Sequence, residues 1–207
     1  ALCDSGMSSD HPALVKAAEW ILSKQVVKEG DWAIKNPQAM PGGWAFEFYN
    51  ELYPDCDDTA EILIFLNRVG LPDSYHKLKE SERAISWLLS MQCQSGGWAA
   101  FDVDNEKEIL NQVPFADHGA MLDPPTADVS GRVLWLLGQI GFNKDHLIVE
   151  KVIGFIKDRQ ESDGSWWGRW GVNYIYGSWL ALTGLASIGE DMRQPYVRRA
   201  IKWYEDH

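Results

Sequence analysis

Two kinds of apolar segment alternate along the chain. Amphipathic helices are predicted where apolar side chains recur at helical spacing between polar ones, in residues 16–24, 82–91 and 149–159. Helices that are apolar on most sides are predicted in residues 58–69, 127–140 and 176–188, each followed by a capping glycine, Gly70, Gly141 or Gly189. A helix that is apolar all round must be buried, whereas an amphipathic one can face water. The alternation therefore predicts an all-α fold in which inner helices are wrapped by outer helices, a partial α/α barrel (toroid).

An internal repeat supports this arrangement. An aromatic residue is followed five positions later by glutamine and then by a glycine-containing turn that a tryptophan closes. The three copies are Trp20-Gln25-Trp32, Trp87-Gln92-Trp98 and Phe155-Gln160-Trp166. Residues 1–6 resemble the last turn of an inner helix, and residues 200–203 resemble the start of an outer one. We therefore expect residues 1–207 to be part of one α/α-barrel domain, truncated at both ends.

Composition narrows the possible partners. A net charge of −11 argues against nucleic acid, because phosphates are bound by Lys and Arg. The three cysteines are odd in number and widely spaced, so neither a disulfide framework nor a zinc site is expected. No run approaches the roughly 18 apolar residues of a membrane span. Any membrane contact is expected to be peripheral, or to be made by regions missing from this chain.

The run Asp55-Cys56-Asp57-Asp58-Thr59-Ala60 is the strongest candidate for chemistry. Three neighbouring carboxylates resist ionising together, so one of them can remain a proton donor. Two other interpretations stay open. Asp58 and Glu61 have the spacing of a capping box, and Asp57, Asp58 and Glu61 also read as the D-D-x-x-E pattern of a magnesium site. No second metal motif accompanies them, so no metal is expected.

The Gln-to-Trp repeats, the acidic run and Gly168-Arg169-Trp170-Gly171-Val172-Asn173-Tyr174 together resemble bacterial squalene-hopene cyclases. The resemblance covers the whole chain and implies the part of the catalytic domain that carries the D-x-D-D motif, with the second barrel domain absent. It implies that Asp57 protonates squalene, flanked by Asp55 and Asp58, and that cyclisation to hopene or hopanol needs no cofactor. It also implies a peripheral (monotopic) enzyme on the cytoplasmic face of the cell membrane, and a possible homodimer.

The resemblance also assigns roles to residues outside the acidic run. Asp128, Arg132 and Tyr176 are expected to support the acid, although some family members have His where this chain has Arg132. Substrate and cation-binding positions are Phe46, Phe101 and Trp170, with Phe115 at the constriction through which substrate enters. A relative has Tyr in place of Phe101, so only the π face can serve here. A buried Asp128–Arg132 pair and plain core packing of the aromatics remain open as alternatives.

Three other functions are considered for the whole protein. A protonating diterpene cyclase shares the D-x-D-D acid and differs in substrate length. A protein prenyltransferase subunit shares the helical toroid but needs zinc ligands that the sequence does not offer. A lipid-binding helical-repeat module would hold the polyene without converting it.

Overall fold

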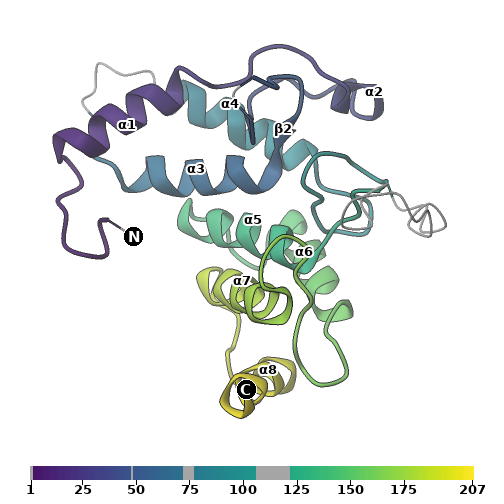
Figure 1. The fold of residues 1–207 in the computed structure, drawn as a ribbon. Coiled ribbons are helices and arrows are strands. Elements are labelled where there is room, and N and C mark those ends of the chain that lie inside the picture. The colour runs from purple at the N-terminus through teal and green to yellow at the C-terminus, as the bar shows by residue number, and fades with distance from the viewer. Residues whose placement is uncertain (1, 48, 72–76, 106–121) are drawn as a thin grey trace. The chain divides into compact units, whose positions relative to one another are not determined.

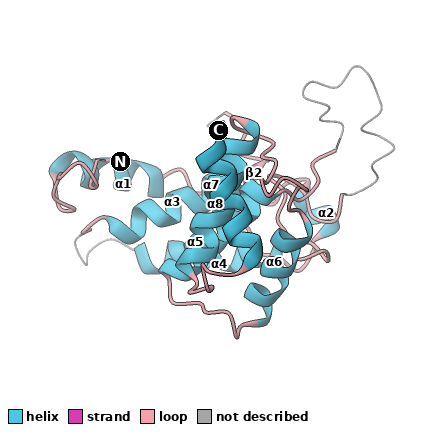
Figure 2. Ribbon diagram, turned by 90° about the horizontal axis from the view of Figure 1, so that it is seen from below, coloured by secondary structure: helices cyan, strands magenta, loops and turns pink. Residues whose placement is uncertain are grey.

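The structure is a computed structural model that describes residues 2–47, 49–71, 77–105 and 122–207 (Figure 1). It divides into two compact units, residues 1–90 and 91–207. The first unit contains α1 (Pro12–Leu22), α2 (Trp32–Lys35), β1 (Trp44–Ala45), β2 (Pro54–Asp55), α3 (Cys56–Arg68) and α4 (Lys77–Ser90). The second contains α5 (Ala127–Gln139), α6 (Leu147–Asp158), α7 (Asn173–Ser187) and α8 (Pro195–Asp206). Figure 2 shows that helix predominates in the described residues.

All six helices predicted from the apolar pattern are present, with boundaries that differ by a few residues. Helix α3 begins at Cys56 and α7 begins at Asn173, both before the predicted starts at Asp58 and Tyr176. The polar residues of a first helical turn carry no apolar periodicity, so the pattern detects a helix late. The outer helix expected from residue 200 onward is α8, which already begins at Pro195.

Glycine caps two of the three apolar helices as predicted. Gly141 after α5 and Gly189 after α7 have φ values of +94° and +76°, the left-handed conformation that glycine adopts without steric cost. The prediction is wrong for Gly70. Val69 ends α3 in an extended conformation, and the Gly70 N–H donates to the Ser9 carbonyl at 3.0 Å. A bond to another segment therefore replaces the glycine cap at the end of α3.

Each repeat glutamine links two backbone segments through its side-chain amide. Its Nε2 donates to the carbonyl of a glycine in the following turn and to a carbonyl in the first turn of the next amphipathic helix, at 2.7–3.0 Å. These acceptors are Gly42 and Glu80 for Gln25, Gly96 and Ile148 for Gln92, and Gly164 and Tyr196 for Gln160. One amide thus satisfies two carbonyls and fixes the distance between consecutive repeats.

The first copy of the repeat closes on Trp44, and the prediction of Trp32 is wrong. In every copy the backbone N–H of the closing tryptophan donates to a buried hydroxyl in the next apolar helix. These bonds, at 2.8–2.9 Å, join Trp44 to Thr59, Trp98 to Ser130 and Trp166 to Ser178. Trp32 instead lies in α2, within a longer connection, and its ring packs edge-on against Trp87 with centroids 6.0 Å apart.

Helices α5 and α7 pack closely because glycines lie at their contact. A Cβ on Gly131 would lie 2.6 Å from the Leu180 backbone, and one on Gly184 would lie 2.4 Å from the Gly131 carbonyl oxygen. The two backbones can therefore approach only where side chains are missing. Burial on most sides is confirmed for α5. In α7 the predicted residues 176–188 are also mostly buried or half-buried, although Trp179 is exposed.

Candidate active site

Three carboxylates occupy the start of α3. Asp55 is the N-cap residue, and its Oδ1 accepts the backbone N–H of Asp57 at 2.6 Å and that of Asp58 at 3.1 Å. Asp57 and Asp58 lie in the first helical turn, where the N–H groups and the helix dipole favour negative charge. The alternative in which Asp58 caps the helix together with Glu61 is wrong, because the helix begins earlier and Asp55 has that role.

A short antiparallel ladder holds this turn from its other side. Strand β1 pairs with β2, and Trp44 lies opposite Asp55 in the register. The Trp44 N–H also donates to Thr59, one turn into α3. Trp44 therefore binds the chain on both sides of Asp57 and Asp58, through Asp55 and through Thr59, and so fixes the turn that carries the carboxylates.

Burial makes Asp55 a weak acid. Asp55 is only 6% exposed, and this loss of solvation raises the pKa of its carboxyl group well above the usual range. The charges of Asp58 and Asp57 raise it further, while the two N–H bonds that it accepts lower it. Asp57 and Asp58 are half-buried.

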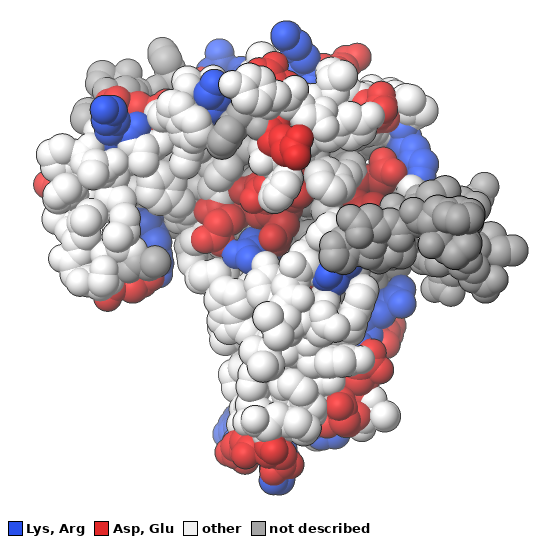
Figure 3. All heavy atoms as spheres, viewed as in Figure 1, with Lys and Arg blue, Asp and Glu red and all other residues white. Residues whose placement is uncertain are grey.

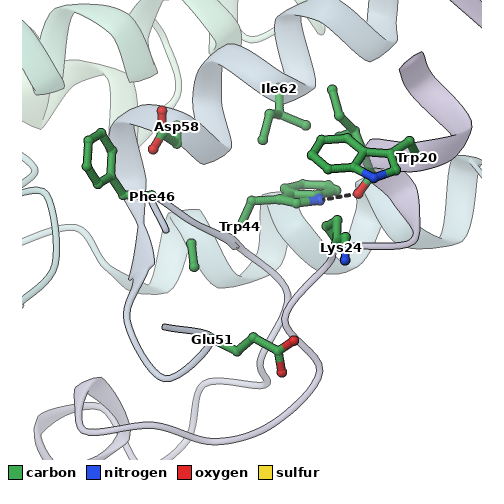
Figure 4. Close-up of a pocket in the computed structure, with 9 residues that line it drawn as sticks. Trp20, Lys24, Trp44, Phe46, Glu51, Asp58 and Ile62 are labelled. Atoms are coloured by element: carbon green, nitrogen blue, oxygen red, sulfur yellow. Dashed lines mark hydrogen bonds between the residues drawn. The ribbon is translucent and has the colours of Figure 1, made fainter. Parts of the chain in front are cut away.

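A cavity of about 170 Å³ opens beside α3 within the first unit. Its wall contains Asp58 and Ile62 from α3, Trp44 and Phe46 from the β1 segment, and Trp20 from α1. Figure 4 shows Asp58 beside the Phe46 ring and Trp20 farther along the cavity, near Ile62. The acidic turn is thus next to a mostly apolar cavity with three aromatic rings in its wall.

In the second unit, Asp128 and Arg132 lie one turn apart on α5, and each bonds to a neighbouring segment. Asp128 is fully buried, and its Oδ2 accepts the backbone N–H of Trp170 at 3.1 Å. The Arg132 guanidinium donates to the hydroxyl oxygen of Tyr176 at 2.7 Å and lies 6.0 Å from the ring centroid. Because arginine cannot accept a hydrogen bond, the hydroxyl proton of Tyr176 must point to another acceptor. Arg132 therefore binds the oxygen of the Tyr176 hydroxyl and directs its proton away from the guanidinium.

The aromatic side chains predicted to bind a cation are placed differently from one another. Phe101 and Trp170 meet edge to face, with centroids 6.2 Å apart and an interplanar angle of 89°. The Arg169 guanidinium lies 5.3 Å from the Trp170 ring centroid, so one face of that indole already has a cation. Phe46 belongs to the first unit, is 68% exposed and lines the cavity there. Phe115 lies outside the described residues.

The structure thus gathers the predicted residues in two groups. Asp55, Asp57, Asp58 and Phe46 belong to the first unit. The second unit contains Phe101, Trp170, Asp128, Arg132 and Tyr176. Within the second unit, backbone and hydroxyl contacts connect Asp128 to Trp170 and Arg132 to Tyr176.

Sequence reasoning missed Asp123. It reads as a turn residue before Pro124 and Pro125, and nothing local reveals its contacts. In the structure its Oδ2 accepts the backbone N–H groups of Phe101 at 2.5 Å and Asp102 at 3.2 Å, more than twenty positions earlier in the chain. Burial raises the pKa of Asp123 from its usual value, and the bonds from these N–H groups lower it. Only long-range structure shows that this carboxylate holds a predicted cation-binding residue.

The described part of the chain offers neither a metal site nor a membrane-spanning helix. Among the residues described, no group of three or more His, Cys, Asp and Glu side chains is arranged to hold a metal ion. No described helix is long and apolar enough to cross a membrane. On the face shown in Figure 3, the described Lys and Arg side chains are interspersed with Asp and Glu.

Comparison with known sequences identifies the family. The sequence profile described as "Squalene-hopene cyclase C-terminal domain" matches residues 1–207. The chain belongs to this family. The squalene-hopene cyclase of Schizosaccharomyces japonicus is 48% identical over 84% of the chain, and that of Alicyclobacillus acidocaldarius is 42% identical over 91%. Dammaradiene synthase from Dryopteris crassirhizoma is 45% identical over 98%. The chain spans only 26–31% of the length of these relatives.

Solved structures give the same fold. The type II terpene cyclase MstE from Scytonema, without ligand, has a TM-score of 0.59 and 23% identity, covering 93% of this chain and 48% of its own. A point variant of this cyclase in complex with geranylgeranyl dihydroxybenzoate has a TM-score of 0.60. Terpene cyclases have an α/α barrel, so the predicted fold class, part of an α/α barrel, is confirmed for this squalene-hopene cyclase relative.

Proposed function

We propose that the protein to which this chain belongs is a squalene-hopene cyclase, with Asp57 as the general acid that starts the reaction. The observation that carries the proposal is the acidic turn at the start of α3, beside an aromatic-lined cavity, in a chain 42–48% identical to two such cyclases. The substrate is squalene or a polyene of similar length, and the product is hopene or hopanol. No metal or redox cofactor is needed for a reaction of this kind.

The first step is a proton transfer from the acid to the π electrons of an alkene. The terminal alkene of squalene takes the proton of the Asp57 carboxyl, so that a C–H bond forms and the adjacent tertiary carbon becomes cationic. Each following alkene attacks the cation in turn and closes a ring. Loss of a proton gives hopene, and addition of water gives hopanol. Either ending returns one proton to the medium, so the acid is restored without any net change in oxidation state.

The start of α3 suits this step because it stabilises the anion that Asp57 leaves behind. Asp57 lies in the first turn, where the positive end of the helix dipole favours negative charge. Asp55 resists ionisation because burial raises its pKa, and so it contributes little negative charge that would oppose ionisation of its neighbour. A weak base such as an alkene needs both effects, since its protonation requires a strong acid with a stabilised conjugate base.

In this proposal Asp128, Arg132 and Tyr176 support the acid, and the aromatic rings of the second unit stabilise the cation. Phe101 and the open face of Trp170 offer π electrons worth roughly 0.5 to 2 kcal/mol each to a desolvated cation. Asp128 holds the Trp170 backbone, and Arg132 orients the Tyr176 hydroxyl as a donor. Arg132 keeps its charge at all working pH values, so it cannot shuttle a proton as a histidine could.

The apolar substrate determines where such an enzyme works. Squalene partitions into the hydrocarbon interior of a bilayer, so we place the whole protein peripherally (monotopically) at the cytoplasmic face of the membrane, as a possible homodimer. Flotation of the full-length protein with liposomes tests this location, because a protein without membrane affinity stays at the bottom of the gradient.

Replacement of Asp57 by Asn in the full-length protein tests the proposal directly. Asn keeps the size of the side chain and cannot donate a carboxyl proton, so turnover of squalene should fall by about 10²- to 10⁴-fold. Glu61→Gln is the matched control, because Glu61 is an exposed carboxylate on the same helix and its loss should leave turnover unchanged. Gas chromatography and mass spectrometry identify the products.

The product analysis also separates the diterpene cyclase and the lipid-binding module from the proposed function. Undiminished hopene formation by Asp57→Asn rules out the assignment of the acid. Conversion of a diterpene precursor but not of squalene indicates the diterpene cyclase. Squalene that is bound and recovered unchanged by the wild-type protein indicates the lipid-binding module.

A further inference from the structure

The Phe101 and Trp170 rings have no helix to hold them. Phe101 lies in the connection between Trp98 and the undescribed residues, and Trp170 lies in the turn before α7. Trp170 is 43% exposed, so packing alone does not fix the ring. The two rings nevertheless meet at nearly a right angle, with centroids 6.2 Å apart. Something other than regular secondary structure must position them.

Asp123 attaches the first of these rings. Its Oδ2 accepts the N–H groups of Phe101 and Asp102, two consecutive amides that converge on one carboxylate oxygen. Two amides on one oxygen fix the direction of the peptide plane, and therefore the direction in which the Phe101 side chain leaves the backbone. The bonds connect residues 21 and 22 positions apart, so they tie together two separate segments.

Arg169 attaches the second ring to the same segment. Its Nη2 donates to the carbonyl of Leu122, the residue next to Asp123, at 2.9 Å. Its guanidinium lies 5.3 Å from the Trp170 ring centroid. The contacts therefore form a closed circuit, which runs from Phe101 through Asp123, Leu122 and Arg169 to Trp170 and returns to Phe101 through the edge-to-face ring contact.

The burial of polar atoms in this circuit costs more folding free energy than a simple loop anchor requires. The Asp123 Oδ1 atom is buried and has no hydrogen-bond partner among the described residues, and the same holds for Arg169 Nε. Unpaired polar atoms in a dry setting oppose folding. The circuit therefore carries a cost in folding free energy, so its contribution to stability alone does not account for it.

We propose that Asp123 is a positioning residue for the Phe101 and Trp170 rings, holding them through the circuit with Arg169, and that it thereby determines how far ring closure proceeds. The proposal rests on the proposed function and adds a residue to it. Cation–π attraction depends steeply on where the ring lies relative to the cation. A displaced Phe101 ring stabilises the intermediate cation less, so more of the substrate is released after fewer ring closures.

Product analysis of variants in the full-length protein tests this. Asp123→Ala removes both amide bonds, and the share of partially cyclised products should rise about two- to fivefold relative to wild type. Asp123→Asn retains an oxygen that can accept the same amides and should restore most of the wild-type ratio. Asp163→Ala is the matched control, because the Asp163 carboxylate anchors a turn through Ser165 and lies outside the circuit. The control should keep the wild-type product ratio even where its melting temperature falls.

A double variant separates positioning from a general loss of structure. Phe101→Leu should shift the products in the same direction as Asp123→Ala. If Asp123 acts through Phe101, the double variant should be no worse than the stronger single variant. Independent, additive effects on the product ratio, or a wild-type ratio in Asp123→Ala, would overturn the proposal.

A measurement without turnover keeps this test apart from the failure of the proposed function. The full-length protein is labelled with 5-fluorotryptophan. The ¹⁹F resonance that is present in the wild-type spectrum and absent from that of Trp170→Phe is assigned to Trp170. That resonance should shift in Asp123→Ala and in Arg169→Met, because both break the circuit, and should stay in place in Asp163→Ala. An unmoved Trp170 resonance in both circuit variants refutes the positioning role. Absence of cyclic products from wild type refutes only the cyclase.

Discussion

The turn that leads into α3 and the turn that leads into α5 are built on the same skeleton. In each, a glutamine amide binds a glycine carbonyl, and a tryptophan N–H donates to a hydroxyl one turn into the following helix. In each, that tryptophan also pairs antiparallel with the helix-capping residue, Trp44 with Asp55 and Trp98 with Thr126. Aligned in this way, Asp57 and Asp128 occupy the same position on their helices.

The two turns differ at the cap. Asp55 accepts two backbone N–H groups, whereas the Thr126 side chain makes no capping bond and its Oγ1 is buried without a partner in the described part of the chain. An aspartate at the cap brings a third carboxylate next to Asp57, while a threonine leaves Asp128 to bind a neighbouring backbone. The shared backbone arrangement thus holds both turns in place, and the residues at its cap positions decide their chemistry.

The largest effect that separates the two turns is expected at the glycines that the glutamines bind. A Cβ on Gly42 would lie 2.6 Å from the Arg83 carbonyl oxygen, and one on Gly96 would lie 2.5 Å from that of Lys151. Alanine at either site should cost about 1–3 kcal/mol through this clash. Gly96 has φ +96°, so alanine there should cost about 1–2 kcal/mol more. Thermal unfolding of the two full-length variants measures the difference.

Gly154→Ala is the control for the helix-forming and volume effects of alanine, because nothing lies within 4 Å of the Cβ that it adds. A shared skeleton requires that both Gly42→Ala and Gly96→Ala destabilise the protein. If Gly42→Ala behaves like the control, the two turns are not equivalent at this point.

The next effect concerns the hydroxyls that both helices offer to a tryptophan. Thr59→Val and Ser130→Ala each leave a buried Trp N–H without its acceptor, and each should lower the free energy of unfolding by about 1–3 kcal/mol. Chemical denaturation measures the losses. Ser178→Ala is a third copy of the same change and should match them. Unequal losses at the three sites would show that the tryptophan bond matters differently in each repeat.

The skeleton was largely predictable from sequence, because it follows from periodic features. Apolar periodicity located six helices, and the recurring glutamine located the turns. The first copy failed because Trp32 and Trp44 both follow glycine-containing segments. The bonds from Gln25 to Gly42 and from Trp44 to Thr59, which join residues 17 and 15 positions apart, distinguish them. Pairing across such distances leaves no mark on local sequence pattern.

The candidate site was predictable to a different degree. The acidic run indicated the chemistry, but not that Asp55 is the cap, because the cap is set by where the backbone leaves the β2 pairing. Asp123 escaped detection for a related reason, since a turn aspartate has the same local signature whether its carboxylate meets solvent or the Phe101 amide. Residue types indicate what a site can do, and long-range contacts decide which residues take part.

The smallest expected effect lies at the caps themselves. Asp55→Ala removes two capping bonds and should cost about 0.5–2 kcal/mol, whereas Thr126→Ala removes none and should cost less. Asp55→Asn keeps an oxygen for both N–H groups and removes the titration. Its stability at neutral pH should therefore equal or exceed that of wild type, because Asn carries no charge to be desolvated.

The pH dependence of stability identifies the cause of this last effect. The pKa of Asp55 is raised in the folded protein, so the folded state keeps a proton that the unfolded chain has released. This contribution to stability is complete below the ordinary aspartate pKa and is lost as pH rises through the raised value. Asp55→Asn should flatten that decline. Asp163, whose pKa is lowered by bonds from Ser165, has the opposite sign, so Asp163→Asn should remove stability that is lost as pH falls. If the fall in stability with rising pH persists in Asp55→Asn, the titration belongs to another carboxylate of the α3 turn. Asp55 would then be only a structural cap, as Thr126 is in the second turn.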